Sequence, residues 1–275
     1  GSGNGTQEST AEQGPDSGGE LPKGLTVIYT EHDGLYQVSS GGAALPEKIV
    51  DGAGISSPVF AEDGSSAAYL RDGNLYGYSF ELGREELLLR EVISFVPDWE
   101  GGFLASSAEE GIVYVTIGQD PVMIWKPGAV SGGWVQCERL SLSPDGRLLA
   151  FTQRKYVNHR EDPDTSPFDQ NMGIWIYDRN GNTAVPAMID EGELPFFEWV
   201  NKSEGAVYPD SWPGKWSPDS TRLFIWRDVR SGSMRADGIP AAVYDVKEQK
   251  MEYLYIGKDN EEWNLEDVLL PYNEN

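Results

Sequence analysis

The feature that most constrains the fold is a repeated turn between two apolar stretches. Three copies place the turn at Asp63-Gly64, Asp145-Gly146 and Asp219-Ser220, and a degraded fourth copy over residues 95–105 carries Glu100-Gly101 at the same point. Apolar stretches on both sides of such a turn predict a β-hairpin. A hairpin that recurs along the chain predicts an array of small sheets.

Each hairpin is followed by a third short strand, usually with an aromatic residue near its centre. The expected third strands are 34–38, 74–78, 111–115, 173–177 and 241–244. A fourth strand is expected near each of Ile49, Leu88, Ile124, Ala187 and Tyr253. The unit is therefore an antiparallel four-stranded meander of about 40 residues, a length and strand count that predict a propeller blade.

Two of the turns also carry a family resemblance. Leu-Ser-Leu-Ser-Pro144-Asp145-Gly146 and Trp216-Ser-Pro218-Asp219-Ser220 resemble the Ser-Pro-Asp-Gly repeat of TolB-type propellers, which is also found in the propeller domains of dipeptidyl-peptidase-like proteins. The resemblance covers residue 25 to about residue 256 and implies an all-β propeller. It implies little about activity, because this repeat occurs in binding scaffolds, periplasmic assembly factors and regulatory domains of peptidases.

The first repeat lacks its innermost strand. Residues 26–29 align with the second strand of a blade, which would leave an unpaired edge of the kind that proteins normally cover. We expect the apolar segment 263–272 to supply the missing strand and close a ring of five blades. The alternative is an incomplete six-bladed ring, in which 265–270 forms a terminal helix or begins a sixth blade.

Composition excludes two classes of partner. The chain has 45 acidic and 21 basic residues, a formal net charge of -24, so it would repel nucleic-acid phosphate and anionic membrane surfaces. No apolar run approaches the roughly 18 residues that a membrane-spanning helix needs, so we expect no direct membrane insertion. The single cysteine, Cys137, is expected to be a small buried residue without catalytic function.

The amino-terminal segment differs from the rest. Residues 1–22, rich in Gly, Ser, Thr, Gln and acids, predict a disordered linker or tether ahead of a single propeller domain over 23–275. A tether of this kind is typical of exported lipoproteins at the cell surface, so we expect an extracytoplasmic protein with a lipid anchor as one means of attachment. A cloning remnant followed by an ordinary ragged terminus is the alternative.

The long insertions predict where function resides. They cover 154–172, 190–214 and 228–238, and in a meander blade all three connections emerge on the same face of adjacent blades. Long loops on a rigid scaffold commonly bind ligands, and aromatic and arginine side chains dominate binding hot spots. The candidate binding residues are Tyr156, His159, Arg160, Phe197, Trp199, Trp212, Arg230 and Arg235. The alternative is that the aromatic side chains pack as core and the arginines pair with nearby acids.

Catalytic motifs are sparse. The only histidines are His32 and His159, and no Gly-x-Ser-x-Gly nucleophile motif is present. We assign Asp63, Asp145 and Asp219 to turn formation. Residues 162–169 offer several oxygen donors but lack the glycine and glutamate of an EF-hand loop, so we expect no bound metal and no cofactor.

These observations favour a non-catalytic binding or scaffolding propeller that engages a protein or a glycan. The competing hypothesis is a carbohydrate-active hydrolase with carboxylates in a central funnel, which would need an acid and a second carboxylate on either side of the scissile bond. The only acids close to the expected inner strands are Glu138 and Glu62, and Glu62 is better explained by its turn. An enzyme is therefore the less favoured reading.

Overall fold

The computed structural model describes residues 25–39, 45–130, 133–157, 170–187, 209–229 and 241–254. Within these ranges the regular secondary structure consists of β-strands alone, and the strands form five antiparallel sheets. The described ranges contain no helix with the length and apolar character needed to cross a bilayer.

We refer to the sheets, in chain order, as blades one to five and list their strands from the inner edge outward. Blade one contains β1 (Thr26–Glu31), β2 (Gly34–Ser39) and β3 (Glu47–Asp51). Blade two contains β4 (Ile55–Phe60), β5 (Ser66–Arg71), β6 (Asn74–Ser79) and β7 (Arg84–Leu89). Blade three contains β8 (Val92–Pro97), β9 (Phe103–Ser107), β10 (Gly111–Val115) and β11 (Val122–Trp125).

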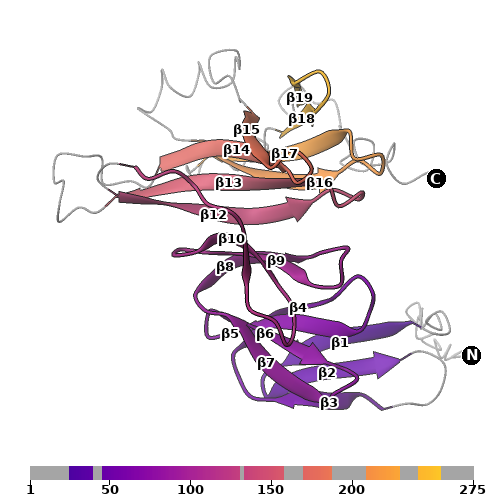
Figure 1. The fold of residues 1–275 in the computed structure, drawn as a ribbon. Helices are drawn as coiled ribbons and strands as arrows, with labels where there is room; N and C mark the ends of the chain where they lie inside the picture. Colours follow the sequence, from indigo (N-terminus) through magenta and orange to yellow (C-terminus); the bar gives the residue numbers. More distant parts are fainter. Residues whose placement is uncertain are drawn as a thin grey trace, which may run out of the picture.

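The last two blades follow the same order. Blade four contains β12 (Gly133–Leu142), β13 (Leu148–Val157), β14 (Gln170–Asp178) and β15 (Thr183–Ala187). Blade five contains β16 (Pro209–Trp216), β17 (Arg222–Val229), β18 (Ala241–Asp245) and β19 (Lys250–Leu254). Figure 1 shows the five blades as successive layers, with blade one and blade five at opposite ends of the array.

The predicted meander of antiparallel strands is confirmed, and so is the missing inner strand of blade one among the described residues. Blades two to five each have four strands, whereas blade one begins with β1, the counterpart of β5. The segment 263–272 lies outside the described residues, so closure of the ring by that segment stays a prediction. Residues 1–22 also lie outside them.

The predicted turn chemistry is confirmed. Asp63, Asp145 and Asp219 each accept a hydrogen bond from the backbone N–H two residues further on, at 2.9, 3.0 and 3.1 Å. Gly146 has φ 70°, and Ser220, which stands at the glycine position, has φ 61°. Residues other than glycine resist this left-handed conformation, which explains the glycine of the repeat.

The core consists of separate apolar layers between successive blades. Because neighbouring residues of a strand point to opposite faces, one strand can contribute to two layers. Phe103 of β9 packs in the layer toward blade two, and Leu104 packs in the layer toward blade four. Ile176 and Leu223 share the layer between blades four and five. An inner blade is therefore covered on both faces.

Blades four and five are taller than the others. The strands β12 and β13 have 10 residues each and β14 has 9, while the strands of blades one to three have 4 to 6. Figure 1 shows β12 and β13 projecting beyond β8 and β9. The loop boundaries expected from the sequence were wrong here, because Tyr156 lies in β13 and Trp212 lies in β16. Hydrogen bonding to the neighbouring strands extends β13 and β16 into segments that the sequence predicts to be loops.

Candidate binding site on blades four and five

The site is built around an irregularity in the inner strand of blade four. The pairing of β12 with β13 shifts register between Glu138 and Ser141, which is a β-bulge. Arg139, inside this bulge, has φ 55°. Bulges re-aim side chains, and they are common beside functional sites.

Glu138 accepts contacts at both carboxylate oxygens. Arg154 Nε donates to Oε2 at 3.1 Å, and the hydroxyl of Tyr156 donates to Oε1. The side chains of Glu138 and Arg154 are only 13% and 7% exposed. A buried carboxylate needs this pairing, because removing it from water unpaired is costly. The ion pair fixes the carboxy-terminal part of β13 against β12.

An aromatic platform stands above that ion pair. The rings of Trp134 and Tyr156 are stacked, with centroids 5.6 Å apart and planes 12° from parallel. The two residues are register partners on β12 and β13. Trp134 is 46% exposed, so part of its ring remains accessible to solvent beside its stacking partner.

Arg139 connects blade four to blade five. Its guanidinium lies over the ring of Trp212, with the central carbon 4.2 Å from the ring centroid. Both residues stand on inner strands, β12 and β16. The set is named the blade-four/five patch. It consists of Trp134, Glu138, Arg139, Arg154, Tyr156 and Trp212.

Two of the candidate residues from the sequence, Tyr156 and Trp212, belong to this patch. The other six lie outside the described residues; they are His159, Arg160, Phe197, Trp199, Arg230 and Arg235. The patch members Trp134, Arg139 and Arg154 were not among the candidate binding residues, and Glu138 was considered only as an acid of the hydrolase hypothesis. The sequence did contain one signal, the alternation of side chains along a strand. Every second residue of β12, namely Trp134, Gln136 and Glu138, lies on the same face as its register partners Tyr156, Arg154 and Thr152.

The acids on the inner strands bear on the hydrolase hypothesis. Glu62 lies in the turn after β4, as expected. Asp210, which the sequence analysis placed in a loop, lies in β16 and is the register partner of Asp228. Glu138 faces Arg154 and Tyr156, so its two oxygens are occupied by donors.

Other groups considered from the sequence have structural surroundings. The His32 side chain is 92% exposed in the turn after β1, as expected for a solvated turn residue. It lies near Glu31 and Asp33, but Asp33 is paired with Lys48 and accepts a hydrogen bond from Tyr36. Cys137 is fully buried, and burial raises the pKa of its thiol to about 12. A thiol in that state is a poor nucleophile at neutral pH.

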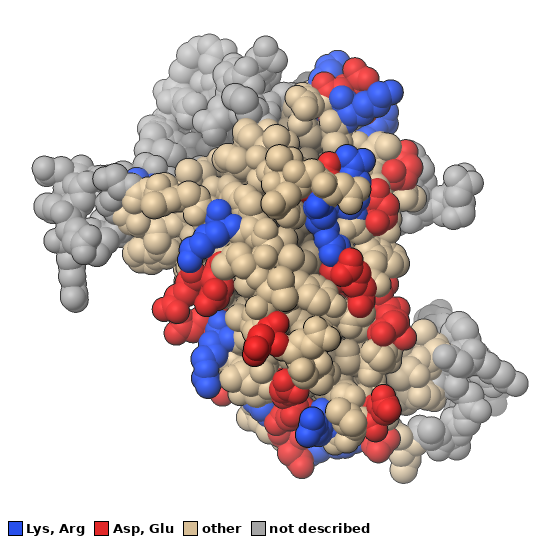
Figure 2. All heavy atoms as spheres, viewed as in Figure 1, with Lys and Arg blue, Asp and Glu red and all other residues tan. Residues whose placement is uncertain are grey.

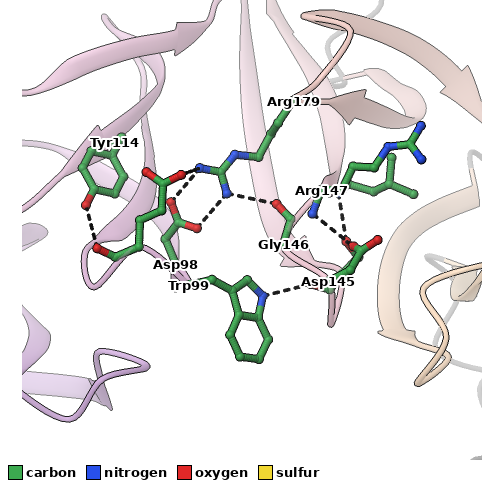
Figure 3. Close-up of polar contacts among 10 residues, drawn as sticks. Asp98, Trp99, Tyr114, Asp145, Gly146, Arg147 and Arg179 are labelled. Atoms are coloured by element: carbon green, nitrogen blue, oxygen red, sulfur yellow. Dashed lines mark hydrogen bonds and ion pairs between the residues drawn. The ribbon is translucent and has the colours of Figure 1, made fainter.

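The opposite end of the blades carries a polar network (Figure 3). Arg179 donates to both carboxylate oxygens of Asp98 and, at 3.0 Å, to the carbonyl of Gly146. Trp99 Nε1 donates to the carbonyl of Ser143 at 3.2 Å. These contacts join the turns of blades three and four, which is a structural function.

Charge on the surface is mixed. Figure 2 shows Lys and Arg side chains interspersed with Asp and Glu on the face in view. Several cations of the described residues are paired with acids, among them Arg147 with Asp178 and Arg222 with Asp245. The guanidinium of Arg139 has no carboxylate partner among the described residues, which is of interest in a chain with net charge -24.

Comparison with known proteins gives the fold. An ancestral GH74 enzyme aligns with TM-score 0.54 and 14% identity over 90% of this chain and 33% of the enzyme. The protein has a β-propeller fold. An extracellular domain from B. thetaiotaomicron aligns with TM-score 0.49 and 7% identity over 86% of this chain and 27% of that one. The oligogalacturonate lyase of Vibrio parahaemolyticus aligns with TM-score 0.46 and 12% identity over 82% and 59%.

At these identities the similarity extends to fold alone. The propeller spans a third or less of the GH74 enzyme and of the B. thetaiotaomicron protein. No protein-family model matches the sequence, and no curated protein matches it.

Proposed function

We propose that this propeller is a non-catalytic binding or scaffolding module that engages a protein or glycan partner through the blade-four/five patch. The observation that carries the proposal is the exposed Trp134–Tyr156 stack at the projecting ends of β12 and β13. Aromatic side chains supported by rigid strands make broad contact surfaces with little loss of conformational entropy. The three long connections predicted from the sequence, most of whose residues lie outside the described ranges, are expected to contribute further contacts.

Binding is favoured over glycoside hydrolysis by the surroundings of Glu138. Hydrolysis would need this acid to face substrate and a second carboxylate across the bond. Both of its oxygens instead accept hydrogen bonds from within blade four. A carboxylate used in this way stabilises the patch.

The proposal extends to kinship and location. The Ser-Pro-Asp-Gly turns support a relation to TolB-type propellers and to the propeller domains of dipeptidyl-peptidase-like proteins. The composition of residues 1–22 supports an exported protein that is tethered at the cell surface, with a lipid as the anchor. The propeller would then present its taller blades to partners outside the cytoplasm.

A pair of tryptophan variants tests the binding site. Trp134 and Trp99 are 46% and 51% exposed, and they lie toward opposite ends of β12. We expect Trp134→Ala to abolish capture on a glycan array or from cell-envelope extract, while Trp99→Ala retains it. Melting temperatures measured in parallel separate lost binding from lost folding. Equal capture by Trp134→Ala and the parent chain would refute this site.

A further inference from the structure

Arg139 has a backbone conformation that is unfavourable for its residue type. Its φ of 55° lies in the left-handed region, which residues other than glycine adopt uncommonly. The equivalent bulge position in β4, six residues before the turn aspartate, is Ser57 with φ 52°. A small residue is thus sufficient for the bulge itself. Strain retained at an arginine points to a use for its side chain.

The guanidinium of Arg139 is oriented but not neutralised. Its contact with the Trp212 ring holds its plane, and the side chain is exposed. No carboxylate of the described residues forms a salt bridge with it, and the neighbouring Glu138 already pairs with Arg154. The described part of the patch therefore carries one uncompensated positive charge. A planar guanidinium binds a carboxylate through two parallel N–H groups.

The other end of the patch offers an exposed aromatic ring, that of Trp134. Trp134 and Arg139 are separated by five positions along β12, or about 16 Å at the usual rise of a strand. The near-parallel Trp134–Tyr156 stack suits the apolar face of a sugar ring better than an inserted side chain, which needs a pocket. Aromatic platform and guanidinium together match a short, extended, acidic oligosaccharide.

We propose that the ligand of the blade-four/five patch is a hexuronate-containing glycan whose carboxylate is bound by Arg139. This inference rests on the proposed function and assigns its ligand class. In the bound state the guanidinium remains over Trp212 and directs two N–H groups to the carboxylate. One or more sugar rings pack on Trp134.

The test uses the full chain and three probes of equal length: a trimer of 1,4-linked galacturonate, its methyl ester and a neutral galactose trimer. Binding is measured by calorimetry. We expect the acid to bind at least about tenfold more tightly than its ester, the difference typical of a charged hydrogen bond. Arg139→Gln should lower affinity for the acid by a similar factor and affinity for the ester by a smaller one. Arg139→Lys should be intermediate, because it keeps the charge and loses the planar fork.

Three results would overturn the inference: equal affinity for acid and ester, acid binding unchanged in Arg139→Gln, or tighter binding of a glutamate tripeptide than of the acidic trimer. The melting temperature of Arg139→Gln reports any loss of the contact with Trp212. If the neutral trimer or an envelope protein binds in a Trp134-dependent manner while Arg139→Gln has no effect, the binding function stands and the acidic ligand is refuted. If Trp134→Ala also has no effect on any ligand, both fail.

Discussion

The guanidinium of Arg179, in the turn after β14, donates hydrogen bonds of 2.7 and 2.9 Å to the carboxylate of Asp98, in the turn after β8. Asp98 is completely buried, and the Arg179 side chain is 18% exposed. Blade three and blade four thus share an ion pair across their boundary. Removing one member leaves the other as an uncompensated charge in a region with little solvent.

We predict that Arg179→Met lowers the free energy of unfolding by about 3–5 kcal/mol, the usual cost of breaking a buried pair. Urea denaturation of both chains measures the difference. Arg147→Met is the matched control, because Arg147 pairs with Asp178 with half of its side chain exposed. An exposed pair of this kind contributes about 0–1 kcal/mol. Similar losses in both variants would contradict the structural importance of the shared pair.

Two glycines of the repeat allow backbone strain to be separated from steric overlap. Gly64 and Gly146 have φ 69° and 70°, so alanine is equally strained at both positions. A Cβ on Gly64 meets nothing within 4 Å, whereas a Cβ on Gly146 would lie 2.3 Å from Cδ1 of Trp99.

Gly64→Ala should therefore cost about 1–2 kcal/mol from backbone strain alone. Gly146→Ala should cost a further 1–3 kcal/mol or so, because Trp99 must move. Chemical denaturation measures both values. The double variant Gly146→Ala with Trp99→Ala should recover part of the second cost, and failure to do so would argue against contact between the two turns.

Acid should destabilise the propeller through its turn aspartates. A hydrogen bond from the Ser217 hydroxyl, followed by those from Thr221, lowers the pKa of Asp219. The Arg147 guanidinium likewise lowers the pKa of Asp178. Because the folded pKa is below the unfolded value, these groups stabilise the fold fully above about pH 4. That contribution is lost as pH falls through the folded pKa.

We predict that the melting temperature declines below about pH 4 and that Asp219→Asn, although less stable at neutral pH, declines less steeply. Asp120→Asn, which removes an exposed carboxylate between β10 and β11, controls for the change in net charge. A parallel decline in Asp219→Asn and the parent chain would show that this turn does not contribute to acid sensitivity.

Ring closure predicts an asymmetry between the two termini. If the carboxy-terminal segment closes the ring, deleting residues 259–275 leaves the edge of β1 without a partner. The deletion should then lower the melting temperature and increase self-association. Deleting residues 1–20 should change neither property. Calorimetry and light scattering provide the readouts. An unchanged melting temperature after the carboxy-terminal deletion would reject closure by this segment.

The sequence predicts the fold because its signals are local. Asp145-Gly146 and Asp219-Ser220 specify a turn through a side chain, a backbone N–H and a positive φ that lie within a few residues of one another. Each hairpin can therefore be predicted from a short segment of sequence. The count and order of strands follow from repeating that segment.

The binding patch depends on partners that are distant in sequence. From the sequence alone, Arg154 and Tyr156 are predicted to begin a loop. In the structure they lie in a strand, where both donate hydrogen bonds to Glu138 on the neighbouring strand. The contact of Arg139 with Trp212 joins two blades and has no local signature. One signal was available for the shared ion pair: blade three has Asp98 where blade four has the buried Ser143, and an acid at that position requires a cation.

The ion pair across the blade boundary also limits how this molecule can be divided. The repeat in the sequence suggests modules that could be excised, shuffled or displayed one at a time. A cut between β11 and β12 would separate Asp98 from Arg179 and would also remove the acceptor of the Trp99 indole. The smallest fragment that keeps this boundary intact is therefore a two-blade unit, even though the repeating unit of the sequence is a single blade.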